Sequence, residues 1–389
     1  MDHTKTTLLT RRVQEIIDRN SLLKKLSSRR KLRVKLGIDP TIPHLHLGHA
    51  VPLMKLREFQ QAGHTAVLII GDWTARIGDP SGKDETRPNL SAQEVTRNAK
   101  EFFRQANLIL DKKKTEIHLQ SEWYKNFKLE QIIHLTAVVS VGEMLSHETF
   151  RKRLRENLPF SLHELLYPLL QGYDSVAVRA DVELGAVEQK FNLLMGRKIQ
   201  RAFGQPQQDV ILMPYLIGLD GKQKMSKSLR NFVALDDSAD EMFGKIMSIP
   251  DGLIKHYFEL CTNLSLAQIK KALSAVNPRD AKARLAFAVA SFYHGEKQAR
   301  AAQENFEKKF GKKSGAIRPD YVLKIKSGSH GLADVLVAAR LAASKSEARR
   351  KIKEGAVEVD GRRIVDEKAR INLKKGSLLR LGKRFARVG

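Results

Sequence analysis

The feature that most restricts the fold is a strand–helix–strand succession within residues 33–72. The run "RVKLGI" (33–38) alternates in polarity and predicts a short buried strand, and "TAVLIIGD" (65–72) predicts a second one. Between them, from His46 to about Gln61, apolar residues recur at the spacing of a helix. Parallel strands need a crossover of this kind, so the succession predicts a βαβ unit and a parallel sheet of the α/β class.

The pattern changes along the rest of the chain. Residues 128–165 are mostly helical and interrupt the sheet as an insertion would, and "DVILMP" (209–214) predicts the last clear buried strand. Strand patterns are absent from about 240 to 310, which predicts an all-helical domain. The expected divisions are an N-terminal helical segment (1–32), an α/β domain (33–235, insertion at about 120–165), a helical domain (236–315), a linker (316–329) and a small α+β domain (330–389).

Positive charge is concentrated toward the C-terminus. The chain carries 69 Lys and Arg against 43 Asp and Glu, a net charge of +26, and residues 340–389 alone hold 16 basic and 6 acidic residues. Such a field suits a polyanion, above all a nucleic acid, although a generally basic proteome is an alternative explanation. One predicted helix presents basic residues at helical spacing, which makes them the candidate RNA contacts: Lys345, Arg349, Arg350 and Lys353.

Composition also excludes several classes of protein. Cys261 is the single cysteine, which excludes an internal disulfide framework and a Cys-rich zinc site. No apolar run reaches the roughly 18 residues that a membrane span needs, and the N-terminus has no signal-peptide pattern. We therefore expect a cytoplasmic protein without a membrane partner.

The segment "DPTIPHLHLGH" (39–49) places histidines at the start of the predicted helix. A helix N-terminus attracts phosphate through its free N–H groups and partial positive charge. His46 and His49 share one helix face, Gly48 permits close approach of a ligand, and Thr41 adds a hydroxyl. Two alternatives are that the histidines only cap and pack, or that they bind a metal, for which no third ligand lies nearby in the sequence.

A second motif, "KMSKS" (224–228), follows the last predicted strand on a loop. Two lysines three residues apart among small polar residues suit a flap that closes over a triphosphate, because ammonium groups are good point charges for phosphate oxygens. Each motif alone is a weak signal, whereas the two in this order on this topology are highly specific.

Together the motifs resemble the two signatures of class I aminoacyl-tRNA synthetases. Further segments are similar to tyrosyl-tRNA synthetases of bacterial type, and the tail resembles the S4-type RNA-binding module of such enzymes. These segments are "KLGIDPTIPHLHLGH", "IGDPSGKDETRP", "SLHELLYPLLQGYDSVAVRADVELG", "LDGKQKMSKSLRNF" and "MFGKIMSIPD". The resemblance implies a Rossmann-like catalytic domain with a helical insertion, followed by a helical anticodon-binding domain and an S4-like domain.

The resemblance also implies roles for individual residues. Thr41, His46 and His49 would stabilise the charge on the phosphates of ATP, Lys83 and Arg87 would hold the pyrophosphate, and Lys224 and Lys227 would belong to the flap. The remaining ATP-site residues would be Gly37, Asp39, Gly48, Gly185, Glu188 and Met225. The tyrosine site would comprise Asp79, Tyr167 and Gln171 at the amino group, Gln189 near the carboxylate, and Asp174 at the phenolic hydroxyl. Lys35 would also belong to this site. It occupies a position where shorter family members carry a tyrosine that reaches the phenolic hydroxyl of the substrate.

The implied reaction uses ATP with Mg²⁺ to activate L-tyrosine and then transfers the tyrosyl group to tRNA(Tyr). It needs alignment and hydrogen-bond donors near the phosphates, with no nucleophilic side chain. A buried Asp174 would reject phenylalanine by roughly 10⁴–10⁵, since the analogue leaves the carboxylate unpaired. The family's homodimer would form through the insertion at about 120–165.

One departure from the family pattern keeps alternatives open. Residues 185–189 read Gly-Ala-Val-Glu-Gln where the family reads Gly-Gly-Thr/Ser-Asp-Gln, so Ala186 and Glu188 alter the expected ribose contact. The alternatives are an RNA-binding paralogue with weak or altered activity and a tryptophan-specific synthetase. A small-molecule nucleotidyltransferase is disfavoured because it has no use for the basic tail.

Overall fold

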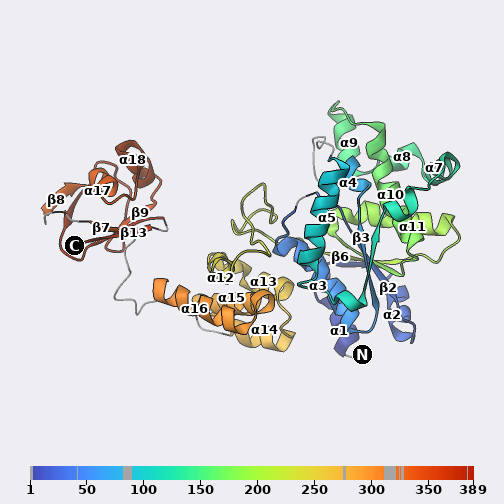
Figure 1. Ribbon diagram of the computed structural model, residues 1–389, viewed down its shortest axis with the longest axis horizontal. Helices are drawn as coiled ribbons and strands as arrows, with labels where there is room; N and C mark the ends of the chain where they lie inside the picture. The colour runs from blue at the N-terminus through green and yellow to red at the C-terminus, as the bar shows by residue number, and fades with distance from the viewer. Residues whose placement is uncertain are drawn as a thin grey trace. The chain divides into compact units, whose positions relative to one another are not determined.

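The computed structural model describes most of the chain, in two compact units formed by residues 1–303 and 304–389 (Figure 1). Within the described residues, every helix is too short or too polar to cross a membrane. The described residues are 3–41, 43–81, 90–274, 277–310, 321–323, 325, 328–382 and 384–389.

A six-stranded sheet forms the centre of the first unit, in the order β1-β6-β5-β2-β3-β4. All neighbouring strands are parallel except β1, which pairs antiparallel with β6. The predicted parallel α/β sheet is therefore confirmed. The strands are β1 (Glu15–Ile17), β2 (Arg33–Ile38), β3 (Thr65–Ile70), β4 (Thr115–Leu119), β5 (Val182–Ala186) and β6 (Asp209–Met213).

Helices α3 and α5 lie on one side of this sheet, and α10 and α11 lie on the other (Figure 1). Helix α3 (Leu47–Gln61) buries the apolar face that its sequence predicts, with Pro52 in its first turns. Helix α5 (Ala92–Ala106) begins with a capping box between Ser91 and Glu94. The other helices of this region are α1 (His3–Thr10), α2 (Arg19–Ser27), α4 (Thr74–Ile77), η1 (Lys112–Lys114), α6 (Ser121–Tyr124), α10 (Tyr167–Ala177), η3 (Val187–Gln189) and α11 (Lys190–Ala202).

The insertion between β4 and β5 is helical, as its pattern predicts. Its inner side packs on α10 and α11 through buried Leu135, Met144 and Phe150. Its elements are α7 (Leu129–Thr136), α8 (Val141–Met144), α9 (Glu148–Arg155) and η2 (Leu162–Leu166).

Residues after 235 form the predicted helices. Capping boxes at Ser238 with Glu241 and at Ser265 with Gln268 fix two of the helix starts. The elements are α12 (Ala239–Met247), η4 (Asp251–Leu253), α13 (Ile254–Cys261), α14 (Leu266–Leu273), α15 (Pro278–His294) and α16 (Glu296–Phe310). Helix α13 contacts α3, so this helical domain packs on the α/β domain.

After α16, the described residues of the second unit form a five-stranded sheet, β10-β9-β12-β13-β7, a two-stranded sheet, β11-β8, and the helices α17 and α18. Asp360 and Gly361, both with positive φ, form the tight hairpin turn between β9 and β10. Its elements are β7 (Tyr321–Leu323), β8 (Gly328–Gly331), α17 (Leu332–Ala338), α18 (Lys345–Lys353), β9 (Val357–Val359), β10 (Arg362–Ile364), β11 (Arg370–Leu373), β12 (Leu378–Leu381) and β13 (Arg384–Val388).

The structure corrects two of the predicted segments. Residues 1–32 are not purely helical, because Glu15–Ile17 forms the edge strand β1. The predicted linker at 316–329 includes β7, which pairs parallel with β13, and the start of β8. Strands of three or four residues are stabilised by their partners and leave almost no periodicity in the sequence. The first part of this predicted linker, residues 316–320, lies outside the described residues.

The separation into two units predicts independent folding of the first. A chain ending at Phe310 keeps α16 and every contact within the first unit, so its melting temperature should match that of the full chain's first unit within about 2 °C. Differential scanning calorimetry of both chains measures this. A loss of cooperative unfolding in the shortened chain would show that the units depend on each other.

Candidate active site

The candidate site residues follow the carboxyl ends of the parallel strands. Strand order reverses between β5 and β2, and ligands of open α/β sheets bind outside such a reversal. The loops after β2, β3, β5 and β6 carry Asp39, Asp79, Glu188 and Lys224, respectively. One sheet edge thus collects residues that lie far apart in the sequence.

His46 and His49 form the N-terminal cap of α3. The His46 Nδ1 accepts from the Gly48 N–H at 3.1 Å, and the His49 Nδ1 accepts from the His46 N–H at 3.3 Å. Their ring centroids are 3.9 Å apart. Burial lowers the pKa of His46 to about 2 and that of His49 to about 4, so both rings are neutral at neutral pH.

Gly48 is required by the position of the His46 ring. A Cβ on Gly48 would lie 2.9 Å from the His46 Nδ1, which is too close for an unshifted ring. Gly37, at the end of β2, has open space where its Cβ would lie, and Thr41 is partly exposed on the following loop. Gly185 differs, because a Cβ there would meet Leu193 at 2.7 Å, so this glycine permits the packing of α11 on β5.

The "KMSKS" segment lies beside the histidines. Met225 is buried against Gly48, and the Leu47 N–H donates to the Val233 carbonyl at 3.0 Å. The positive charge of Lys224 contributes to the lowered pKa of both His46 and His49, although less than burial does. The two predicted motifs are therefore brought together, as expected from the sequence.

The two lysines of the motif differ in their partners. Lys224 makes an ion pair with Glu188, which follows β5. Lys227 is exposed on the loop. Lys83 and Arg87, predicted at the pyrophosphate, lie outside the described residues.

Asp174 on α10 is buried and bonded on both carboxylate oxygens. Gln120 Nε2 donates to it at 2.8 Å and Trp123 Nε1 at 3.2 Å, while the Tyr124 hydroxyl lies 3.4 Å away. Burial raises the pKa of Asp174 to about 7, whereas the charge of Lys35 opposes this shift.

Gln120, Trp123 and Tyr124 are not predicted from the sequence. They follow β4, a partly exposed strand whose hydrophobic pattern is indistinct in the sequence. Had this strand been recognised, the residues after its carboxyl end would have been candidates for the site. Gln120 is itself oriented, since its Oε1 accepts from the backbone N–H groups of Trp73 and Thr74 at 3.2 and 3.0 Å.

Lys35 is turned into the protein interior. Its ammonium makes an ion pair with Glu183 at 2.8 Å and donates to Ser175 Oγ at 2.8 Å and the Gln171 carbonyl at 3.0 Å. These three acceptors use the three ammonium protons. The geometry therefore provides no proton of Lys35 for a substrate hydroxyl, in contrast to the tyrosine-site position expected from the sequence.

Two of the residues predicted at the substrate's amino group, Tyr167 and Asp79, form hydrogen bonds with other predicted site residues. Tyr167 donates to Asp39 Oδ2 at 2.8 Å, and Gln189 Nε2 donates to Asp79 Oδ2 at 2.6 Å. Gln171 Oε1 is buried and has no hydrogen-bond partner among the described residues. An acceptor of this kind fits an incoming ammonium group.

The predicted RNA contacts lie in the second unit. Lys345, Arg349, Arg350 and Lys353 are exposed on α18, whose Ala348 and Ile352 are buried. Lys345 makes an ion pair with Asp334 at 2.6 Å. Surface pairs of this kind are weak, so they leave the helix face available to a polyanion.

Comparison with protein families identifies the class first. Residues 27–311 match the family described as "tRNA synthetases class I (W and Y)", so the chain belongs to the class I aminoacyl-tRNA synthetases. Residues 319–384 match the "Tyrosine--tRNA ligase SYY-like C-terminal domain". More particularly, the chain is a member of the tyrosine–tRNA ligase family, as its relatives indicate.

Two curated relatives named tyrosine–tRNA ligase match almost the full chain. The protein from Thermotoga maritima is 48% identical, over 98% of this chain and 96% of the relative. The protein from Moorella thermoacetica is 45% identical, over 98% and 94%.

Solved structures show the same fold. A C-terminally truncated mitochondrial tyrosyl-tRNA synthetase from Coccidioides posadasii superposes with a TM-score of 0.64 at 23% identity, covering 75% of this chain and 88% of that one. The tyrosyl-tRNA synthetase from Archaeoglobus fulgidus, complexed with L-tyrosine, gives a TM-score of 0.61 at 20% identity, covering 77% and 98%.

The packing of Gly48 predicts a kinetic defect. Gly48→Ala should displace the His46 ring and lower the rate of tyrosine-dependent ATP–pyrophosphate exchange by about tenfold or more, because a small misplacement of a catalytic group is costly. Gly244→Ala on α12 is the matched control, since a Cβ there meets no atom within 4 Å. Equal activity of the two variants would contradict the required position of His46.

Proposed function

We propose that the chain carries out both steps of tyrosine attachment to tRNA. The carboxylate of L-tyrosine attacks the α-phosphorus of ATP, which forms tyrosyl-adenylate and releases pyrophosphate. The 3′-terminal adenosine of tRNA(Tyr) then takes the tyrosyl group. Mg²⁺ enters with ATP as part of the substrate. The observation that carries this proposal is the meeting of a histidine-capped helix with a lysine loop at the reversal of the strand order.

The two histidines act as neutral donors. Because each Nδ1 accepts a backbone N–H, the proton of each neutral ring resides on Nε2. Both Nε2–H groups are then available to phosphate oxygens at a helix N-terminus, which already favours negative charge. Thr41, Gly37 and Gly48 complete this end of the ATP site.

The lysines supply the formal positive charge. Lys224 and Lys227, with Met225 as the buried anchor of their loop, approach the phosphates, and Lys83 and Arg87 hold the pyrophosphate. Glu188 replaces the family's aspartate at the ribose and pairs with Lys224. ATP therefore exchanges this ion pair for phosphate contacts as the loop closes.

Tyrosine is held by acceptors at both of its ends. Asp174 accepts the phenolic O–H, and Gln120 and Trp123 hold its carboxylate in place. Asp79, Tyr167 and Gln171 receive the ammonium group, with Gln189 near the carboxylate. Lys35 acts on Asp174 only through its charge.

The exposed apolar side of the insertion supports a homodimer. Leu129, Val141 and Leu162 are 72%, 70% and 79% exposed, and Ile133 is 59% exposed. A cavity of about 470 Å³ with mainly apolar lining opens between α7, α10 and Trp73. Apolar exposure of this extent marks an interface, and a second copy is the proposed occupant.

The proposed compartment is the cytoplasm, and the basic face of α18 is proposed to contact tRNA.

The first experiment measures ATP–pyrophosphate exchange with each amino acid. Tyrosine-dependent exchange supports the proposal, tryptophan-dependent exchange supports a tryptophan enzyme, and no exchange supports an RNA-binding paralogue.

Lys227→Ala should lower the exchange rate by about tenfold or more with little change in KM for tyrosine, because its partner is phosphate. An equal loss in tyrosine affinity would contradict this role.

The raised pKa of Asp174 predicts a pH-dependent specificity. The ionised carboxylate is the better acceptor, and its fraction rises through a pKa of about 7. The ratio of kcat/KM for tyrosine to that for phenylalanine should therefore rise by roughly threefold or more from about pH 6 to about pH 8. Asp174→Asn, which does not titrate, should lose this rise, and a flat profile in the wild type would contradict the assignment.

The proposed homodimer predicts a charge-sensitive interface. Ile133→Glu places a carboxylate on the exposed apolar side of α7 and should shift the protein from dimer to monomer at about 1 μM in sedimentation velocity. Val322→Glu, an exposed apolar position of the second unit, is the control and should leave the dimer intact. A monomeric wild type would contradict the proposal.

A further inference from the structure

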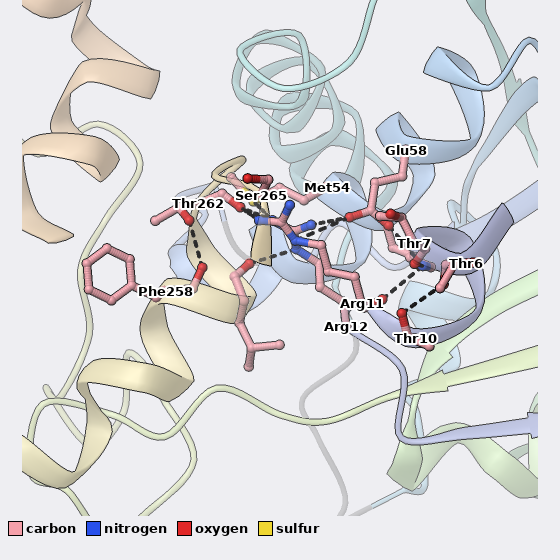
Figure 2. A network of polar contacts seen from close by, with 12 residues as sticks. Thr6, Thr7, Thr10, Arg11, Arg12, Met54, Glu58, Phe258, Thr262 and Ser265 are labelled. Atoms are coloured by element: carbon pink, nitrogen blue, oxygen red, sulfur yellow. Dashed lines mark hydrogen bonds and ion pairs between the residues drawn. The ribbon is translucent and has the colours of Figure 1, made fainter. Parts of the chain in front are cut away.

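A buried cluster of three cations and one carboxylate lies where the N-terminal segment meets α3 and α13 (Figure 2). Arg11, Arg12 and Lys55 all pair with Glu58, at 3.7 Å for Arg11 and 2.9 Å for Lys55. The side chains of Arg12 and Lys55 are 0% exposed. Buried charges are costly unless each is bonded, so this cluster must have a structural or functional reason.

The guanidinium of Arg12 joins two helices. Its Nε donates to the Leu260 carbonyl at 2.9 Å and one terminal nitrogen donates to the Thr262 carbonyl at 2.5 Å, both at the C-terminal end of α13. The other terminal nitrogen donates to Glu58 on α3. A planar guanidinium holds these acceptors at fixed angles, which the single nitrogen of a lysine cannot do.

The positive charges complement the end of a helix. The last carbonyl groups of α13 lack helical partners and carry partial negative charge. Arg11 also donates to the Thr262 carbonyl, and Figure 2 shows both arginines between Glu58 and Thr262. Glu58 carries one negative charge against three positive charges. The carbonyl oxygens at the end of α13 thus stabilise the positive charge that Glu58 alone does not neutralise.

The backbone of Arg12 is strained. Its φ is +55°, in the left-handed region that glycine or asparagine adopts more easily. The guanidinium of Arg12 forms hydrogen bonds through all three of its nitrogens, which offsets the cost of this backbone conformation.

Helix α13 also holds the lysine loop. The Tyr257 hydroxyl donates to the Ile217 carbonyl at 2.7 Å, and the Ile217 N–H donates to His256 Nε2 at 3.4 Å. Ile217 in turn pairs with Lys224 in an antiparallel bridge. One helix therefore contacts the segment that carries Lys224, while Arg12 ties its other end to the helix that begins at His46.

We propose that Arg12 is a positioning residue for tyrosine activation. Together with Tyr257 it makes α13 a spacer of fixed length between the histidines of α3 and the lysines of the loop. This inference rests on the proposed function. Without the Arg12 guanidinium, the joint keeps the bond from Arg11 to Thr262 but loses the bonds from Arg12 to Leu260 and Glu58. Helix α13 can then shift along α3, and the lysine loop shifts with it relative to His46 and His49. Alignment at the phosphates is then lost, while the tyrosine site around Asp174 is unchanged.

The test combines Arg12→Lys with kinetics. Its kcat for tyrosine-dependent exchange should fall by about tenfold or more, with KM for tyrosine within about twofold of the wild type. Arg33→Lys is a control for the loss of a bridging guanidinium, because Arg33 also joins a carboxylate (Glu116) and a carbonyl (Val178), with a side chain that is 32% exposed. It should keep kcat within about twofold.

A double-mutant cycle separates positioning from simple destabilisation. Tyr257→Phe removes the hydroxyl contact with Ile217, and its effect on kcat should overlap with that of Arg12→Lys, giving less than the product of the single losses. Hydrogen exchange should also be faster at residues 254–262 in Arg12→Lys.

The outcomes are distinct from those for the function itself. An inactive wild type overturns the proposed function. An active wild type overturns the positioning role if Arg12→Lys keeps its kcat, if Arg33→Lys loses as much, or if the double variant shows the full product of the losses.

Discussion

The reversal of strand order between β5 and β2 is the constraint on which the rest of the molecule depends. Because β2 pairs in parallel with both β3 and β5, the chain leaves the sheet at one edge after each strand. Helices then run back on either side, so helix starts and loops gather where the strands end. The histidines of α3, the acid after β5 and the lysines after β6 are neighbours for this reason alone.

At the proposed nucleotide end of the site, neutral histidines and charged lysines have different roles. Burial keeps His46 and His49 uncharged, and the capping hydrogen bonds orient both rings from the first turn of α3. Formal charge comes from Lys224, which is 56% exposed and paired with Glu188. An exposed ion pair exchanges partners at little cost, so this end of the site can adjust to ATP.

The proposed tyrosine end of the site is more rigid. Lys35 and Glu183 form an ion pair that is almost fully buried beside Asp174, and removal of one partner of such a pair costs about 3–5 kcal/mol. Asp174 accepts hydrogen bonds from Gln120 and Trp123, and burial raises its pKa to about 7. Arg12 bonds to the end of α13, and Tyr257 of α13 bonds to Ile217. These contacts connect the lysine loop with the packed helices of the domain.

The sequence by itself determined the βαβ unit at 33–72, the helical insertion, the helical domain and the presence of the motifs "HLGH" and "KMSKS", because long apolar periodicities and motifs are local properties of a chain. Only the tertiary structure decided the short strands β1 and β7, the residues around Asp174, the inward direction of Lys35 and the joint held by Arg12. Each of these depends on a partner that is distant in the sequence: β6 for β1, α10 for Gln120, β5 for Lys35 and α13 for Arg12. Local pattern carries no information about such partners, since burial and hydrogen bonding arise only when the chain is folded.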